Sequence, residues 1–496
     1  MAAPARPNIL LIQADQLRAD VLACYGGSTV QTPVLNGLAG ESTVFDRAYC
    51  VTPVCTPARA ALQTGRYPHR VGMHNNIYYP GCLVHELVDT PELLSRRLLA
   101  QGYWSGFTGK WHLGFGARKP DNREWKRHVH HCPLPPAWIS SGTVPSDVGY
   151  HGDDFPGHGG GGHEYPQYLD YLTARGLHLE VKHASRGAAK YGELQGPVEA
   201  TVDYFLAEQT LTHLESATRS GRPFFFSLNF WGPHEPCYIP REYLNRYDPA
   251  ALSPWPSFSA RETNKPSIHA VKRPPGMEWS DFAVALQHYY AHITLIDDQL
   301  GRIFAWLKER GLYDETLIIF TADHGESLGI HGGLTDKSIF MYEETCRIPL
   351  LIKPAGGAAR RRADAFVNTT DFYSTILDYA GCASEDFERD GCSLREWTCG
   401  GSSPDWRDQV VVSASGLAHL GFQQRMLRTG DWKYVFNCGD TDELYDLSAD
   451  PHELSNLVTD PAAGVMLRSM QVRLLQWLEK HEDPLLQAFE RMRVPR

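Results

Sequence analysis

The chain has 496 residues, of which 42% are hydrophobic and 21% are charged, the composition of an ordinary globular protein. The formal net charge of −11 argues against nucleic acid as a partner, because phosphates repel an acidic surface. No apolar run is long enough to span a bilayer, so we expect no membrane partner.

The first residues and the cysteines indicate a compartment. The apolar run at residues 9–12 is too short for a signal-peptide core, and no cleavage site follows it. The eleven cysteines show no paired spacing and are odd in number, which favours reduced thiols over a disulfide framework. We therefore expect a cytoplasmic protein; a mature secreted form that has lost its leader is the alternative.

Residues 8–13 (NILLIQ) form a continuous apolar run, the pattern of a central parallel strand covered on both faces. The run ends at Asp15 and Gln16. In open α/β sheets the site lies beyond the carboxyl ends of the strands, so these two oxygen-bearing side chains are placed to hold a metal ion. A solvated loop is the alternative for so short a motif.

The segment Cys55-Thr-Pro-Ala-Arg59 is predicted to open a helix. Pro57 suits a first turn, and the alanines and leucine of residues 58–62 are good helix formers. Cys55 then lies at the helix N-terminus, where free N–H groups favour an anion, and Arg59 adds a positive charge one turn later. An anionic substrate or a thiolate fits this position, and a buried structural cysteine is the alternative.

Residues 90–100 have helical apolar spacing, with Gly102 as the stop, and a short strand follows at residues 104–107. It leads to Lys110 and His112, which stand two apart in what we interpret as extended chain, so both point to one side. A surface Lys-x-His is the alternative.

Residues 128–165 are rich in histidine and glycine. The irregular spacing of the histidines and the glycine run at residues 159–162 favour a surface loop over a metal site. In an enzyme, such an insertion is a plausible wall or lid of the site.

Two later apolar strands repeat the arrangement of the first. Residues 223–230 lead to His234, and residues 317–320 lead to Asp323 and His324. Asp323 and His324, together with Asp15 and Gln16 after the first strand, are expected to form a four-ligand metal site at adjacent strand ends.

Long helices are predicted between these strands, at residues 198–216 and 282–310, and Lys337 follows the last strand. Past about residue 375 the pattern changes to short strands, which suggest a small antiparallel sheet covered by a helix at residues 462–480. These short strands are expected at residues 410–414, 426–430, 432–436 and 443–447.

The expected fold class is therefore α/β, with a large mostly parallel central sheet flanked by helices and a smaller C-terminal antiparallel sheet plus helix. We predict a catalytic domain at residues 1–375, which includes the insertion, and a C-terminal subdomain at residues 376–496. Length alone allows two to four domains.

The segment Cys55-Thr-Pro-Ala-Arg59 with Thr64-Gly-Arg66 resembles the sulfatase signature, Cys-x-Pro-x-Arg followed by Thr-Gly-Arg. On these motifs the chain is identified, over nearly its whole length, as a member of the formylglycine-dependent sulfatases of the alkaline phosphatase superfamily. Further matches in the family's order are Asp15, Gly109-Lys110-Trp111-His112, Gly232-Pro233-His234, Asp323-His324-Gly325, Lys337 and Leu444-Tyr-Asp-Leu447 through Asn456-Leu457.

The resemblance implies a role for each matched residue. A dedicated formylglycine-generating enzyme would oxidise Cys55, and the hydrated aldehyde would attack sulfur. His112 would accept a proton from the second hydroxyl of the hydrated aldehyde, which then expels sulfate. His234 or Lys337 would protonate or stabilise the leaving oxygen. Arg59, Lys110 and Lys337 would neutralise the transferred group. One divalent cation would be held by Asp15, Gln16, Asp323 and His324 together with residue 55.

Gln16 and His324 depart from many sulfatases, which carry an aspartate and an asparagine there. Because calcium prefers oxygen donors and His324 offers an imidazole, Ca²⁺ and Mn²⁺ both stay open. With Gln16 and His324, the Asp-Gln and Asp-His pairs of this chain resemble those of choline sulfatases and phosphonate monoester hydrolases. Lys110 and His112 are the sulfatase-type residues, so we favour hydrolysis of a small anionic sulfate ester.

Two alternatives stay open: a phosphonate monoester or phosphodiester hydrolase with the same formylglycine, and an inactive anion-binding or metal-binding protein in which Cys55 stays a thiol. The organic part of the ester, whether aryl, sugar or small alkyl, is open as well. Tyr78, Tyr79 and Trp231 line its pocket or simply pack. A homo-oligomer is possible.

Overall fold

The computed structural model describes most of the chain. The described residues are 6–77, 79, 82–116, 143–183, 191–260, 263–273, 276–337, 340–357, 361–382, 387–417 and 420–493. None of the helices in these ranges combines the length and the apolar character that a membrane crossing requires. The cysteines within them are free thiols.

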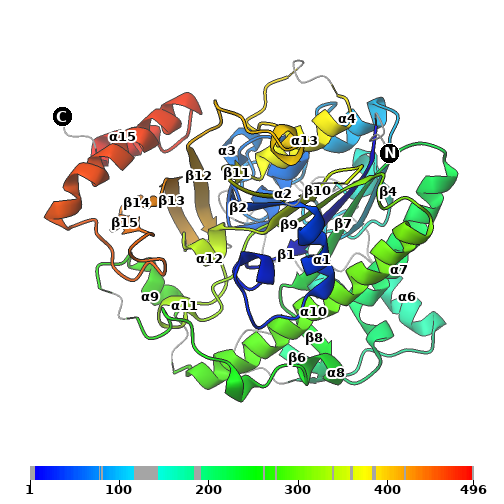
Figure 1. Cartoon of the computed structure of the whole chain (residues 1–496). Helices are drawn as coiled ribbons and strands as arrows, with labels where there is room; N and C mark the ends of the chain where they lie inside the picture. The colour runs from blue at the N-terminus through cyan, green and yellow to red at the C-terminus, as the bar shows by residue number, and fades with distance from the viewer. Residues whose placement is uncertain are drawn as a thin grey trace, which may run out of the picture.

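A central sheet of eight strands organises the fold (Figure 1). β10 runs antiparallel to its neighbours β9 and β2, whereas the other described pairings in this sheet are parallel. The large, mostly parallel sheet that the sequence predicts is therefore confirmed. In spatial order its strands are β11 (Arg361–Asn368), β2 (Thr43–Tyr49), β10 (Leu350–Lys353), β9 (Thr316–Ala322), β1 (Asn8–Asp15), β7 (Phe224–Pro233), β3 (Trp104–Gly109) and β4 (His151–Gly152).

Strand β1 is buried on both faces because its side chains are apolar without alternation. Its core residues Ile9, Leu10, Leu11 and Ile12 are fully buried, between β7 on one side and β9 on the other. The strand continues to Asp15, past the end of the apolar run, because its backbone still pairs with both neighbours.

Helices cover the two faces of the sheet (Figure 1). This places the sheet in the middle of an α/β sandwich, the architecture that buries a sheet with two apolar faces. α1 (Pro33–Glu41), α7 (Val202–Arg219) and α10 (Trp279–Glu309) lie on one face, and α2 (Cys55–Thr64), α4 (Leu94–Ala100) and α13 (Thr370–Tyr379) on the other.

Two helix starts are predicted four residues too early, which is slightly more than one turn. α4 begins at Leu94 rather than at residue 90, because Leu93 is extended, with ψ of 143°. α7 begins after Thr201, which is also extended and whose hydroxyl accepts a hydrogen bond from the Tyr204 N–H at 3.1 Å. Such an N-cap satisfies a free donor at the first turn, so the helix starts there.

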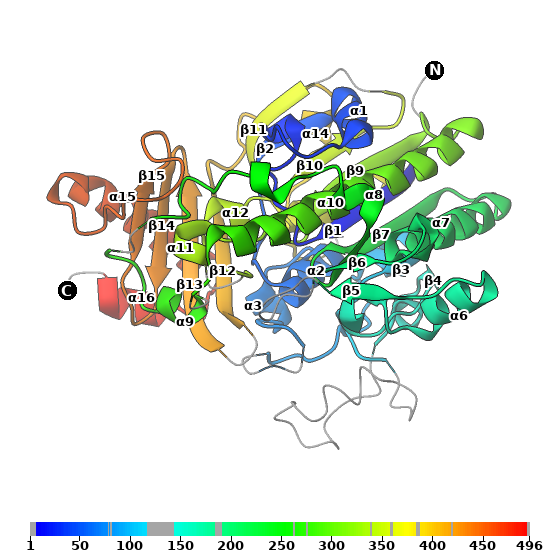
Figure 2. The same ribbon diagram turned by 90° about the horizontal axis from the view of Figure 1, so that it is seen from below.

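The C-terminal antiparallel sheet is also confirmed. Its strands are β12 (Gln409–Leu417), β13 (Leu420–Thr429), β14 (Trp432–Asn437) and β15 (Glu443–Asp446), in that order. Figure 2 shows α15 (Gly464–Lys480) on the outside of this sheet, where Leu474 packs into a core with Leu427 and Phe436. The domain division after residue 375 stays a prediction.

A third, small sheet was not predicted. It consists of β5 (Val181–His183), β6 (Tyr191–Leu194) and β8 (Cys237–Pro240). Strands of three or four residues carry too little alternation to be recognised in a sequence.

Candidate active site

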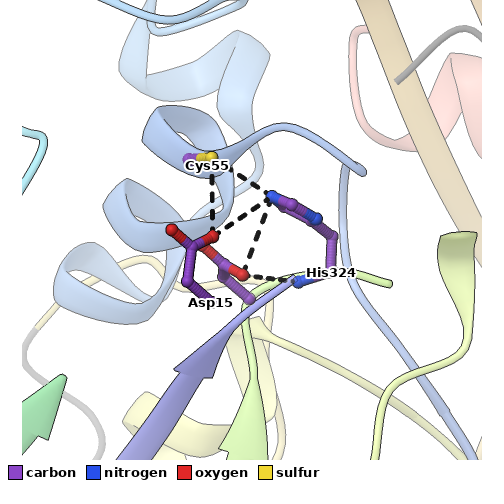
Figure 3. A group of neighbouring side chains, drawn as sticks. Asp15, Cys55 and His324 are labelled. Atoms are coloured by element: carbon purple, nitrogen blue, oxygen red, sulfur yellow. Dashed lines mark hydrogen bonds and ion pairs between the residues drawn. The ribbon is translucent and has the colours of Figure 1, made fainter. Parts of the chain in front are cut away.

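Three chain segments meet at the carboxyl ends of β1 and β9. β1 ends at Asp15, β9 is followed by Asp323 and His324, and the first turn of α2 brings Cys55 over both. Figure 3 shows the Cys55 side chain directed at Asp15 and His324. The strands are hydrogen-bonded neighbours, so residues that are far apart in the chain lie side by side here.

Four buried side chains of this group could hold a cation. Asp15, Cys55, Asp323 and His324 each offer one ligand atom, and these atoms all lie within 4.8 Å of one another. The Cys55 Sγ lies 3.2 Å from His324 Nε2 and 3.8 Å from Asp15 Oδ1. His324 Nδ1 is 2.9 Å from the carbonyl oxygen of Gly325, which leaves Nε2 to face the group.

Gln16 joins this group through its backbone and its side chain. The residue is in the left-handed region, with φ of 64°, and its N–H donates to Asp323 Oδ1 at 3.0 Å. Its side-chain oxygen accepts a hydrogen bond from the Lys337 ammonium. The structure thus brings Lys337 to the same centre.

Arg59 is buried and holds Asp323. Its Nε and Nη2 lie 3.0 and 2.9 Å from Asp323 Oδ2, and its Nη1 donates to the Lys110 carbonyl oxygen at 2.9 Å. Burial raises the pKa of Asp323, but His324, Arg59 and Lys110 outweigh it and hold that pKa well below the usual range. Asp323 is therefore an anion ready to bind a cation.

Two lysines make the position of Cys55 electropositive. The Lys110 ammonium contacts the Asp15 carboxylate and lies 3.4 Å from Cys55 Sγ. Burial raises the pKa of Cys55, but Lys110, Lys337 and His324 lower it to about 5. Lys110, Lys337 and His324 thus stabilise an anionic group at this position.

The expectation that Lys110 and His112 stand in extended chain is wrong. His112 is in the left-handed region, with φ of 53°, and Gly109 has φ of 93°. The chain turns here because Gly109 packs against the β7 backbone: a Cβ on Gly109 would lie 1.8 Å from the Asn229 carbonyl oxygen. His112 is held by its N–H, which donates to the Gly157 carbonyl at 3.1 Å, and by its carbonyl, which accepts from the Thr56 hydroxyl at 2.7 Å.

Replacing Gly109 by alanine is expected to lower the free energy of unfolding by at least about 3 kcal/mol, since it combines a strained φ with a backbone clash. Thermal or denaturant unfolding measures this loss. Gly102→Ala is the matched control, because Gly102 also has a positive φ, of 84°, but nothing lies within 4 Å of its Cβ position. Equal losses in the two variants would contradict the clash.

His234 reaches the site from the end of β7. Its backbone N–H donates to the Asp15 carbonyl oxygen at 3.2 Å, and its Nδ1 is 2.6 Å from the Glu235 carbonyl oxygen. Burial lowers the pKa of His234, and Lys337 and Lys110 lower it further. The imidazole is therefore kept neutral beside Asp15.

His158 is the residue of this site that sequence reasoning missed. The sequence pattern of residues 128–165 favours a surface loop for their histidines, but the His158 ring lies between those of His112 and His234, with centroid distances of 5.1 and 4.9 Å. Residues 128–142 of the insertion fall outside the described ranges. The glycine run next to His158 was a signal, because glycines permit close packing.

The structure describes two of the three aromatic residues considered for the substrate pocket. Trp231 is 3% exposed and packs against Phe155 and Tyr165, so it belongs to the core rather than to an open pocket wall. Tyr79 is half-buried, and Tyr78 lies outside the described residues.

The fold and the site define a class: a hydrolase of the alkaline phosphatase superfamily, with a nucleophile position at a helix N-terminus beside a candidate metal group. The sulfatase family model matches residues 7–382, and the model of the C-terminal region of N-sulphoglucosamine sulphohydrolase matches residues 329–480. The chain belongs to the sulfatase family, and its activity is that of a sulfuric ester hydrolase.

Individual relatives cover nearly the whole chain. It is 30% identical to a multifunctional alkaline phosphatase superfamily protein, PehA, of Trinickia caryophylli, over 97% of each chain. It is 28% identical to the uncharacterized sulfatase YidJ of Escherichia coli (strain K12), over 97% of this chain and 88% of that protein. The crystal structure of the phosphonate monoester hydrolase of Agrobacterium radiobacter superposes with a TM-score of 0.78 at 25% identity, over 96% of each chain.

Proposed function

We propose that this sulfatase acts through formylglycine at position 55 and one divalent cation, on a small sulfate monoester. The observation that carries the proposal is the position of Cys55 at the start of α2, 3.2 Å from His324, 3.8 Å from Asp15 and 3.4 Å from the Lys110 ammonium. The nucleophile position and a positively charged side chain that can neutralise a sulfate group are therefore direct neighbours. Maturation requires a formylglycine-generating enzyme as a partner.

The donor set fits a divalent cation. Asp15, Asp323 and His324 would hold it, with the Gln16 amide oxygen and the oxygen that replaces Cys55 Sγ as further donors. Such a cation supplies positive charge to a sulfate oxygen and to the nucleophilic oxygen. Oxygen donors favour Ca²⁺, whereas the His324 imidazole favours Mn²⁺, so we propose one of these two.

In the proposed reaction the hydrated residue 55 carries two hydroxyl groups, and Cys55 Sγ marks the place of one. This hydroxyl loses its proton to the Asp15 carboxylate and bonds to sulfur as the bond from sulfur to the ester oxygen breaks. The alcohol leaves with a proton from Lys337, or from His234 once the bound anion has favoured protonation of that imidazole. His112 then takes the proton of the second hydroxyl, the carbon–oxygen bond to the sulfate breaks, and the aldehyde is restored. Water rehydrates it for the next turnover.

The cationic side chains divide this work by position. Lys110 contacts the Asp15 carboxylate and Lys337 contacts the Gln16 amide oxygen, so both ammoniums border the place of the transferred group. Arg59 is bound to Asp323 and to the Lys110 carbonyl. We propose that Arg59 acts mainly by orienting these two residues, while the lysines neutralise the sulfate.

Hydrolysis of phosphonate monoesters is the second candidate, favoured by the Gln16 and His324 pair and by the similarity to the Agrobacterium radiobacter enzyme. With residue 55 converted, we expect kcat/KM for an aryl sulfate to exceed that for the matching aryl phosphonate monoester by about 10²-fold or more, because Lys110 and His112 suit a sulfate. Steady-state assays on one preparation measure this ratio. Equal or higher activity on the phosphonate would replace the main proposal by the second.

The remaining expectations stay predictions: a cytoplasmic location, a homo-oligomer, and the division of the chain after residue 375. The organic part of the ester is expected to be an aryl, sugar or small alkyl group.

A further inference from the structure

His158 lies in the active site without a role in the reaction described above. Its ring contacts those of His112 and His234, and its ligand nitrogen belongs to a group with Asp15 and His234 whose atoms all lie within 4.8 Å of one another. Asp15 is also the carboxylate that lies 3.8 Å from Cys55 Sγ. The imidazole therefore borders the space in which a bound ester would sit.

The backbone around His158 is anchored to two strand ends. The Gly157 carbonyl accepts from the His112 N–H at 3.1 Å, and the Gly157 N–H donates to the Gly114 carbonyl at 2.7 Å. The His158 carbonyl accepts from the Trp231 indole N–H at 2.7 Å, next to the end of β7. The ring is thus placed by the same loops that place His112 and His234.

The ring nitrogens of His158 are available to a ligand. Among the residues that the structure describes, none forms a hydrogen bond with them, whereas His234 Nδ1 and His324 Nδ1 each lie within hydrogen-bonding distance of a backbone carbonyl oxygen. An imidazole offers at least one N–H in either protonation state, so His158 can donate to an anionic oxygen.

A second cation is the competing occupant, since Asp15, His158 and His234 could provide three ligands. The charges around them oppose it. The Lys110 ammonium already contacts Asp15, and Lys337 is bound to Gln16 at the same centre. Two buried ammoniums repel a further cation and attract an anion.

We propose that His158 is a catalytic residue that donates a hydrogen bond to the leaving oxygen of the ester, next to His234. This inference rests on the proposed function, because it needs an ester bound at residue 55. The hydrogen bond strengthens as negative charge develops on that oxygen, so it matters most for poor leaving groups.

The test compares His158→Ala with the wild type on 4-nitrophenyl sulfate and phenyl sulfate, using protein whose residue 55 is converted. We expect kcat/KM to fall about 10-fold for the nitrophenyl ester and at least about 10²-fold for the phenyl ester. His158→Asn and His158→Gln each keep an N–H near one ring nitrogen, and one of them is expected to recover part of the loss. His151→Ala is the control, since His151 is exposed in the same segment, and is expected to match the wild type.

Three results would overturn the proposal: no loss, an equal loss for both esters, or a fall in bound metal by one equivalent in His158→Ala. The last would assign His158 to a second cation. A wild type inactive on both sulfates would refute the proposed function instead, and the same leaving-group series on aryl phosphonates would then decide the role of His158. Circular dichroism and metal analysis of each variant separate these results from misfolding.

Discussion

Replacing Cys55 by alanine is expected to lower kcat/KM for an aryl sulfate by at least about 10⁴-fold, with little change in stability. The expected loss is this large because residue 55 is the proposed nucleophile, and Cys55 is the one cysteine in the described group that it forms with Asp15, Asp323 and His324. The Cys55 side chain is small and alanine suits a helix, so the fold survives.

Cys50 provides the matched control for this variant. It is also fully buried and lies in the same tryptic peptide, Ala48 to Arg59, but its sulfur is 3.9 Å from the Thr345 carbonyl oxygen rather than in the metal group. Cys50→Ala is expected to keep the activity. Mass spectrometry of the wild-type peptide is expected to show an alkylated Cys50 beside an aldehyde at position 55. Full alkylation of both in an active preparation would rule out formylglycine.

Replacing Asp323 by asparagine is expected to lower kcat/KM at least about 10³-fold and to weaken binding of the divalent cation by more than about 10²-fold. Groups that merely orient a metal ligand are worth about 10- to 100-fold in affinity, and Asp323 is itself a proposed ligand. The variant also removes the buried charge that pairs with Arg59 at 2.9 Å. Titration of metal-free protein with Ca²⁺ and Mn²⁺ measures the affinity.

Asp297→Asn separates this effect from the loss of any buried carboxylate. Asp297 is as deeply buried as Asp323, but its oxygens accept the N–H groups of Val34 and Leu35, at the start of α1. We expect that variant to lose stability and to keep its metal affinity. If Asp297→Asn and Asp323→Asn bind the cation equally well, Asp323 is not a ligand.

Local patterns predicted the main strands and helices and several of the segments that meet at the strand ends. The apolar run before Asp15 and the one before Asp323 have no polar face and are too short for a buried helix, so they indicated buried strands. Pro57 and the following alanines likewise indicated a helix that starts at Cys55. Since a parallel sheet places its strand ends on one edge, these runs also predicted that Asp15 and Asp323 meet.

The tertiary structure alone decided how the remaining side chains reach that edge. The turn at Gly109 and His112 depends on the nearby backbone of Asn229, a contact between segments far apart in the chain. Arg59 is directed to Asp323 by a buried ion pair that no local pattern contains. His158 enters the site because Gly157 and Trp231 hydrogen-bond its loop to two strand ends. Local sequence sets backbone preference and burial, whereas these placements depend on packing between distant segments.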